Sequence, residues 1–427
     1  NSGSPAYTIH RRIYREKSFS GVEGQFNLND NLYTDTLFMV DEASMIANMG
    51  LGGMSFGSGC LLDDLVHFVY QGRNDRLLLI GDKAQLPPVG EEESPALHAA
   101  MLEGYGLKVY ECDLNEVLRQ SEESGILYNA TMIRQMITHD DITQLPKIHF
   151  AGYSDIKPMP GAELIEALAD SYHHVGLDDT IVVTRSNKRA NIFNQGIRNM
   201  VLDREEELSQ GDILMIVKNN YYWMEEERKK IKEKEIEERR VKSEGTESGT
   251  ATHKVQSSKF QVQSNDIPAF LANGDRAKVL KVRRRIDLYG FRFATLLLQF
   301  PDYGNYELEA TVLLDTLTSE APALTHEQQE QLFHQIEEDY QDIPLKADRM
   351  KAIRQDQFFN ALQVKFAYAV TCHKAQGGQW AHVYVDQGYM TDDMLNPDYI
   401  HWLYTAFTRA TEMLYLVNWP ETQTALE

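Results

Sequence analysis

Short apolar segments that end in polar residues constrain the fold of this chain more than any other feature. Helical patterns separate them, an alternation typical of parallel α/β units. The segments expected to form buried strands are residues 36–40, 77–80, 180–183, 366–370, 383–385 and 413–417. Because open α/β sheets bind ligands at the carboxyl ends of their strands, the polar residues that follow these segments are the first candidates for a site.

The middle of the chain has a different pattern. Short β-like runs separated by turn signals predict a small antiparallel barrel inserted into the second α/β domain. The runs are residues 213–217, 277–282, 292–300 and 307–314. Inside this region lies a charged insertion, 225–262. Its mixed-charge run 225–242 favours a solvated helix over a nucleic-acid-binding arm, and the polar stretch 243–250 is expected to be mobile.

Composition limits the class of protein. A length of 427 residues predicts two or three domains, and no apolar run is long enough for a membrane helix. Cys60, Cys112 and Cys372 match no disulfide or zinc pattern, which suits the cytoplasm. The net charge of −22 argues against a broad basic surface for nucleic acid. It leaves open a narrow groove with its own local potential.

Two polar segments carry the strongest chemical signal. Asp41 and Glu42 follow the first apolar run, and the segment 81–90 (GDKAQLPPVG) follows the second. A nucleotide hydrolase needs one carboxylate to hold magnesium and a second to orient or deprotonate water. An Asp-Glu pair alone also occurs at helix starts, where it caps the helix. Gln85 on the second loop favours the nucleotide interpretation, because a glutamine there can contact the terminal phosphate.

Further segments follow in an order that resembles superfamily 1B DNA helicases of the RecD-like and Dda-like kind. Motifs II, III, IV, V and VI of that family are similar to residues 40–44, 81–90, 114–120, 371–378 and 404–410. The segment that opens the family's second motor domain is similar to 184–191, and the element before motif II is similar to 7–11. The resemblance covers nearly the whole chain. It implies an AAA-family ATPase with a UvrD-like C-terminal helicase domain and a kinship with the exodeoxyribonuclease V alpha subunit.

The resemblance also implies the architecture. Two RecA-like motor domains of the P-loop NTPase type are expected, the first incomplete, with an inserted SH3-like β-barrel. The expected parts are a first motor domain at 1–115 with a small hairpin near 15–35, a second motor domain at 116–208 and 351–427, and the barrel at 209–350.

For the nucleotide site, the resemblance implies ATP and Mg²⁺ as cofactors. Asp41 would coordinate the metal, Glu42 would activate water, and Gln85 would read the terminal phosphate. Arg119 and Arg409 would neutralise charge on the transferring phosphoryl group. Gln376 and Gly377 are further nucleotide-side candidates.

For the nucleic-acid side, the resemblance implies contacts to a single strand. The candidates are Thr8, His10, Thr184, Asn187, Thr371 and His373. In the expected hairpin, Phe19 or Phe26 could stack on a base pair at a DNA fork. An ordinary hairpin with one aromatic side chain packed inward is an equal alternative.

The phosphate-binding loop, Gly-x-x-x-x-Gly-Lys followed by Ser or Thr, does not occur in the sequence. The resemblance places this loop before Asn1, so the chain is expected to be truncated and inactive alone. The truncation would also leave the first motor domain's sheet with an unpaired apolar edge.

These observations predict an ATP-dependent 5′–3′ DNA helicase that acts on single-stranded DNA and forks, with recombination or repair partners and no membrane. The rival interpretation is a non-hydrolysing single-strand-binding or assembly module. A nuclease is less favoured, because no spare carboxylate cluster is evident.

Overall fold

The computed structural model describes residues 7–19, 24–49, 57–114, 123–139, 142–244 and 270–425. The chain divides into two compact units. The α/β unit comprises Asn1–Leu202 and Tyr368–Glu427, and the barrel unit comprises Asp203–Ala367. Within the described residues, no helix combines the length and apolar character that crossing a membrane requires. The three cysteines are free thiols.

The first part of the α/β unit contains a hairpin, a two-stranded parallel sheet and three helices. In chain order its elements are α1 (Ile9–Ile13), β1 (Tyr14–Phe19), β2 (Gly24–Leu28), β3 (Leu37–Val40), α2 (Leu61–Gln71), β4 (Arg76–Leu79) and α3 (Ala99–Glu103). Strands β1 and β2 pair antiparallel, and β3 and β4 pair parallel. The expected early strands are therefore confirmed.

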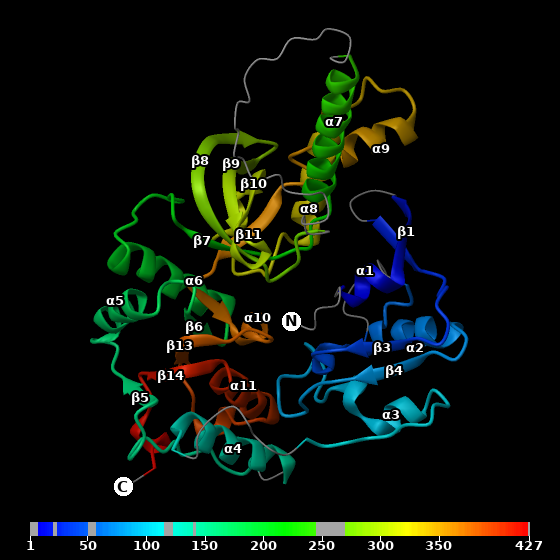
Figure 1. Ribbon diagram of the computed structural model, residues 1–427. Helices are drawn as coiled ribbons and strands as arrows, with labels where there is room; N and C mark the ends of the chain where they lie inside the picture. The colour runs from blue at the N-terminus through cyan, green and yellow to red at the C-terminus, as the bar shows by residue number, and fades with distance from the viewer. Residues whose placement is uncertain are drawn as a thin grey trace. The chain divides into compact units, whose positions relative to one another are not determined.

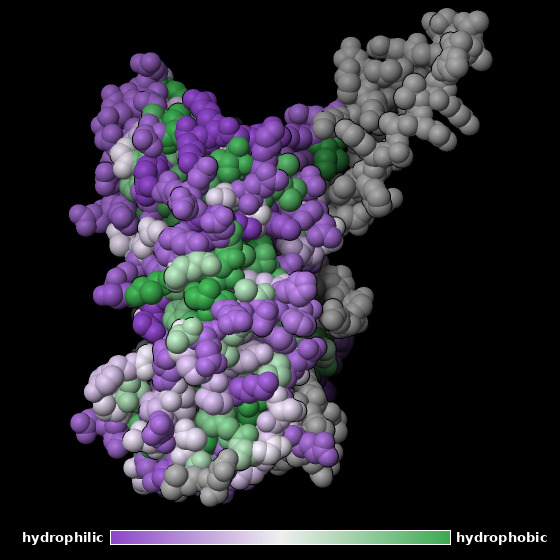
Figure 2. All heavy atoms as spheres, turned by 90° about the vertical axis from the view of Figure 1, so that its left-hand side faces the viewer, coloured by the Kyte–Doolittle hydropathy of each residue, from purple (hydrophilic) through white to green (hydrophobic). Residues whose placement is uncertain are grey.

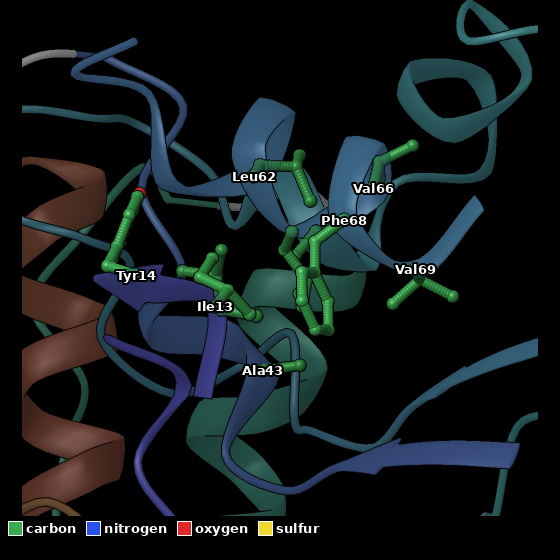
Figure 3. Packing of buried hydrophobic residues seen from close by; sticks show 10 residues of the cluster. Ile13, Tyr14, Ala43, Leu62, Val66, Phe68 and Val69 are labelled. Atoms are coloured by element: carbon green, nitrogen blue, oxygen red, sulfur yellow. The ribbon is translucent and has the colours of Figure 1, made fainter. Parts of the chain in front are cut away.

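A buried cluster holds this first part together. Figure 3 shows Ile13 at the end of α1 packed toward Leu62 and Phe68 of α2. Beside it, the Tyr14 hydroxyl donates to Asp64 Oδ2 at 2.6 Å. Phe26 of β2 packs against the same cluster. This contact supports the inward-packed alternative for Phe26; the side chain of Phe19 lies outside the described residues.

The sheet of β3 and β4 buries only one of its faces in this cluster. Phe38 and Leu77 pack inward, and the alternate side chains are exposed. The exposed apolar residues are Leu37, Met39, Leu78 and Ile80. Parallel sheets normally have both faces covered. In the described part of the chain, no element covers these four apolar side chains.

The second part of the α/β unit is a parallel five-stranded sheet in the order β12-β6-β13-β14-β5. Its elements are α4 (Gly125–Thr138), β5 (Ile156–Met159), α5 (Leu164–His174), β6 (Thr180–Thr184), α6 (Asn187–Gly196), the π-helix η3 (Ile197–Val201), β12 (Ala369–Thr371), α10 (Cys372–Ala375), β13 (Trp380–Asp386), α11 (Pro397–Phe407) and β14 (Ala410–Val417). Helices α5 and α6 cover one face, and α4 and α11 cover the other (Figure 1). Every residue of β6 is buried, as expected for a central parallel strand.

The barrel unit contains a closed barrel in the order β10-β11-β7-β8-β9. Its elements are β7 (Ile213–Ile216), α7 (Tyr222–Glu244), β8 (Arg276–Leu288), β9 (Phe291–Phe300), β10 (Tyr306–Leu313), α8 (His326–Asp339), α9 (Lys346–Arg354) and β11 (Leu362–Phe366). The barrel and the charged helix were both expected and are confirmed. Residues 245–269, which hold most of the stretch predicted to be mobile and the rest of the insertion, lie outside the described residues.

Two details of the barrel differ from the expectation. It is not wholly antiparallel, because β10 and β11 pair parallel. Helices α8 and α9 connect these two strands and return the chain in the same direction. The barrel unit also extends to Ala367 rather than to 350, because β11 pairs with β7 and so belongs to the barrel.

The expectation of one strand at 366–370 is wrong. β11 ends at Phe366 in the barrel, and β12 begins at Ala369 in the sheet. An apolar run cannot reveal such a break by its periodicity, since both strands are buried. The buried Asn194 of α6 serves this junction. Its Oδ1 accepts from the backbone N–H of Tyr368 and Ala369 at 3.1 and 2.8 Å, and its Nδ2 donates to the Ala369 carbonyl at 2.9 Å.

The Asn194 contacts predict a stability effect. Asn194→Ala leaves two buried N–H groups and one carbonyl without their partner, so the free energy of unfolding should fall by about 3 kcal/mol. Ile192→Ala is the control on the same helix, since Ile192 is 56% exposed and its loss should change stability by about 0.5 kcal/mol or less. Urea denaturation measures both. Equal effects of the two substitutions would show that Asn194 does not hold the junction.

Candidate functional site

The turn after β3 carries Asp41 and Glu42. Glu42 adopts φ +53°, a left-handed conformation that is uncommon for a residue with a side chain. The Asp41 Oδ1 accepts from the Glu42 N–H at 2.9 Å, which supports this conformation. Glu42 makes no capping bond to the 3-10 helix that follows (η1, Ala43–Met45). A role in helix capping therefore does not explain Glu42, and strained backbone is characteristic of functional sites.

The loop after β4 packs directly on this turn. The Ala43 N–H donates to the Ile80 carbonyl at 2.8 Å. A Cβ on Gly81 would lie 3.0 Å from the Ser44 nitrogen, closer than a side chain normally approaches backbone, so glycine favours this approach. Asp82 then folds the loop back, because its Oδ1 accepts from the Ala84 N–H at 3.0 Å. Gln85 follows, half-buried, with its N–H donating to the Asp82 carbonyl at 3.1 Å.

Gln376 joins these two loops to the segment after β12. Its Nε2 donates to Ser44 Oγ and to Gln85 Oε1, both at 3.2 Å. The adjacent Gly377 has φ +82°, and a Cβ there would lie 4.0 Å from Glu42 Oε1. The carboxyl ends of β3, β4 and β12 thus bring together residues that are far apart in the sequence.

Arg409 follows helix α11 and is 4% exposed. Its guanidinium donates to three acceptors: the Thr405 carbonyl at 2.9 Å, the Gly378 carbonyl at 3.0 Å and Thr408 Oγ1 at 3.0 Å. Burial lowers the pKa of Arg409, and the negative charge of Glu42 is among the influences that oppose this shift. An arginine remains charged in either case.

Glu42 responds to the same neighbours. Burial raises the pKa of its carboxyl group above the ordinary value; the positive charge of Arg409 lowers it, and the charges of Asp41 and Asp82 raise it. A raised pKa brings a carboxylate closer to the range in which it can accept a proton from water near neutral pH. The structure therefore places Glu42 and Arg409 in one electrostatic environment, together with Asp41, Gln85, Gln376 and Gly377. Arg119 lies outside the described residues.

The candidates for nucleic-acid contact at the amino end have local roles. Thr8 caps α1, since its Oγ1 accepts from the Arg11 N–H at 3.4 Å. His10 is half-buried, and burial lowers its pKa, which favours the neutral ring. Its ring centroid lies 5.7 Å from that of Tyr14. Only Thr8 is exposed.

The candidates on the five-stranded sheet differ in accessibility. Thr184 is fully buried, and its hydroxyl approaches the carbonyls of Ser186 and Val370 at 3.1 and 3.3 Å. Burial of Thr184 disfavours a direct contact with a strand and favours a structural role. Asn187 begins α6 and is half-buried; Thr371, also half-buried, precedes α10, in which His373 is exposed.

A row of basic side chains on β8 was missed in the sequence. Lys278, Lys281 and Arg284 are exposed, and in the described part of the chain none of them forms an ion pair. They lie opposite Gln299, Leu297 and Thr295 of β9. Irregularities after Val279 and Val282 keep the three cations on one face, although their spacing of three residues does not match a regular strand. Figure 2, which turns this side of the barrel toward the viewer, shows a mainly hydrophilic surface.

The carboxylates of the site are of the kind that a magnesium–nucleotide complex uses. Among the described residues, no group of three or more His, Cys, Asp or Glu side chains could hold a metal ion. Magnesium in nucleotide sites keeps several waters and binds one or two carboxylates plus phosphates. The exposed carboxylate of Asp41 meets that requirement.

Comparison with known proteins gives one family match. The model of the UvrD-like helicase C-terminal domain matches residues 366–417. That stretch of the chain is similar to a helicase C-terminal domain. It contains Thr371, His373, Gln376, Gly377 and Arg409. No curated protein sequence matches the chain.

Solved structures give weaker likenesses. The crystal structure of Pif1 helicase from Candida albicans is 12% identical, with a TM-score of 0.40, and the match covers 92% of this chain and 73% of that one. For Pif1 helicase from Bacteroides in complex with ADP-AlF3 and ssDNA, the identity is 12%, the TM-score 0.41 and the coverage 92% and 72%. TM-scores of this size do not establish a common fold. The family model and the geometry of the site carry the functional interpretation.

The arrangement around Glu42 predicts how its pKa responds to its neighbours. Asp41→Asn and Asp82→Asn each remove a negative charge and should lower the pKa of Glu42, whereas Arg409→Met should raise it. NMR titration of selectively ¹³C-labelled glutamate, with Glu42→Gln to assign the signal, measures the shifts. A pKa of Glu42 that is the same in all three variants would place Arg409 and the two aspartates too far away to act on it.

Proposed function

We propose that the chain is the motor of an ATP-dependent DNA helicase of superfamily 1B, RecD-like, that moves 5′ to 3′ on single-stranded DNA. The observation that carries the proposal is the common environment of Glu42 and Arg409. One comes from the first part of the α/β unit, and the other from the segment that matches the UvrD-like helicase C-terminal domain. A carboxylate to orient water and an arginine to neutralise developing charge are two of the groups that catalysis of phosphoryl transfer uses.

The proposed roles follow from the chemistry of the side chains. Glu42 accepts a proton from the attacking water or orients it, and Gln85 contacts the terminal phosphate. Gln376 and Gly377 close the site from the segment after β12. Arg409 acts on the transferring phosphoryl group, and we assign the same role to Arg119.

ATP and Mg²⁺ are the proposed cofactors. Asp41 would hold the metal, which neutralises phosphate charge when bound. The Asp41 side chain is exposed beside Glu42, so its carboxylate is accessible to a metal ion that arrives with the nucleotide. Phosphate binding by this mechanism also needs a cradle of backbone amides. Turnover is therefore measured on the complete protein that the gene encodes.

Single-stranded DNA is the proposed partner, at forks and in recombination or repair. Thr8, His10, Asn187, Thr371 and His373 remain candidates for contacts in the α/β unit. In the barrel unit, which we propose to be SH3-like, the basic row of β8 suits the same partner. Its opposite residues on β9 alternate along the strand, so the three cations repeat at about 7 Å, and an extended strand presents phosphates in a row.

The function is tested first at Arg409. In the complete protein, Arg409→Ala should lower DNA-stimulated ATP hydrolysis by about 10³-fold or more, because the guanidinium acts on charge that appears in the transition state. Arg409→Lys should restore little activity, since lysine lacks the planar fork. Turnover and melting temperature are measured on the same preparation.

Two outcomes would contradict the proposal. A stable Arg409→Ala protein with normal turnover would remove the arginine from the reaction. Strand binding by the complete wild-type protein without any turnover would instead favour a non-hydrolysing binding module.

A second test addresses the barrel. Replacing Lys278, Lys281 and Arg284 together by Gln should weaken binding of single-stranded DNA. It should also reduce the slope of log K against log salt by about 2, since each phosphate contact contributes about 0.7. Fluorescence anisotropy over a salt series measures both quantities for residues 1–427.

The control has the same loss of charge elsewhere in the barrel unit. Lys229, Lys230 and Lys232 lie on α7, where the first two pair with Glu226 and Glu227. Their replacement by Gln should leave the salt slope nearly unchanged. If both triple variants lose the same slope, the net charge and not the β8 row governs binding.

A further inference from the structure

One face of α11 holds the loop that carries Gln85. His401 Nδ1 lies 2.9 Å from the Ala84 carbonyl, so this nitrogen carries a proton and donates. The Tyr404 hydroxyl donates to Asp82 Oδ2 at 2.7 Å. The Leu86 N–H donates to Thr405 Oγ1 at 2.8 Å. Residues 401, 404 and 405 are spaced so that they share one side of a helix, and together they bind Ala84, Asp82 and Leu86 of the loop.

Arg134 of α4 also contacts Asp82. Its Nη2 lies 3.6 Å from Asp82 Oδ1, and its Nη1 donates to the Tyr404 hydroxyl at 3.4 Å. Burial and the charge of Asp82 raise the pKa of Tyr404, so the hydroxyl keeps its proton. The Asp82 carboxylate therefore has a charged and a neutral partner on two different helices, in addition to the Ala84 N–H.

Thr405 connects the loop that carries Gln85 to Arg409. Its hydroxyl accepts from the Leu86 N–H and donates to the His401 carbonyl at 2.8 Å. Its own carbonyl accepts from Arg409 Nε at 2.9 Å. Thr405 thus contacts both the loop that carries Gln85 and the side chain of Arg409. A displacement of the loop relative to α11 would therefore change the hydrogen bonds of a residue that also holds Arg409.

We propose that Tyr404 and Arg134 are positioning residues that hold the Gln85 loop through Asp82, in register with Arg409. The inference rests on the proposed function, in which Gln85 and Arg409 act on one phosphate. Neither Tyr404 nor Arg134 needs to touch the nucleotide. Their effect reaches the reaction through the placement of Gln85.

Tyr404→Phe tests the hydroxyl, because it removes the bond to Asp82 and keeps the buried ring. Tyr399→Phe is the matched control: Tyr399 is buried on the same helix, and its hydroxyl donates to Gln387 at 2.5 Å, away from the loop. In the complete protein, Tyr404→Phe should lower kcat for DNA-stimulated ATP hydrolysis about tenfold. KM for ATP should change by less than about twofold, since positioning acts on the reaction step. Tyr399→Phe should change neither.

The loop itself provides a readout that needs no turnover. In residues 1–427, amide hydrogen exchange of a peptide containing Ala84 and Leu86 should become faster in Tyr404→Phe and stay unchanged in Tyr399→Phe. Asp82→Ala should have at least as large an effect, since it removes the acceptors of the Tyr404 hydroxyl and of the Ala84 N–H. The double variant with Tyr404→Phe should exchange no faster than Asp82→Ala alone, because the Tyr404 hydroxyl then has no acceptor left to lose.

Arg134 is tested by Arg134→Lys and Arg134→Met. Lysine keeps the charge beside Asp82 and should restore part of the kcat that Met loses. Exchange in the loop that is equal in Tyr404→Phe and Tyr399→Phe would overturn the inference. Equal kcat values of Tyr404→Phe and Tyr399→Phe, in a complete protein that hydrolyses ATP, would also overturn it. A complete wild-type protein that does not hydrolyse ATP would overturn the proposed function, while the exchange experiment would still decide whether Tyr404 positions the loop.

Discussion

The hydrogen bonds between helix α11 and the loop after β4 are the interaction on which the candidate site depends. Glu42 and Gln85 lie in the first part of the α/β unit and Arg409 lies in the second, and these hydrogen bonds join the two parts next to the site. Asp82, Ala84 and Leu86 each bond to α11, and Gln376 adds a bond to Gln85 from the segment after β12. Most of these bonds involve backbone groups or a buried hydroxyl, which are costly to leave unpaired.

The sequence predicted the elements of this site well because its signals are local. An apolar run followed by Asp41-Glu42 or by Gly81-Asp82 specifies both a buried strand and a polar turn at its carboxyl end. Parallel pairing then brings such turns to one edge, as the pairing of β3 with β4 shows. The barrel strands and the charged helix α7 were predictable for the same reason, since their alternation and charge lie within single segments.

Relations between remote segments were not predictable. The run 366–370 shows no sign of the change from barrel to sheet, because the side chain that serves the junction, Asn194, lies far away in the chain. Tyr404 begins the segment 404–410, in which the sequence indicated a role for Arg409 only; the bond from the Tyr404 hydroxyl to Asp82 depends on a residue 322 positions away. Lys278, Lys281 and Arg284 lie on one face only because β8 is irregular. In a regular strand residues three apart would point to opposite faces, so the sequence pattern does not predict the row. For Asn194 and Tyr404 a long-range partner decides the role, and for the basic row the register of β8 against β9 does.

The carboxylates around Glu42 constrain which form of a nucleotide can bind. Glu42 lies within the influence of Asp41, Asp82 and one arginine, so a bare polyphosphate would add negative charge beside three carboxylates. Repulsion of that kind also opposes ionisation of Glu42, which must be a carboxylate to accept a proton. A divalent cation that arrives with the phosphates and binds Asp41 would offset both effects. On the proposed function, the acidity of the site therefore favours the magnesium complex of the nucleotide as the species that binds, and Glu42 would be most effective as a base only when that complex is in place.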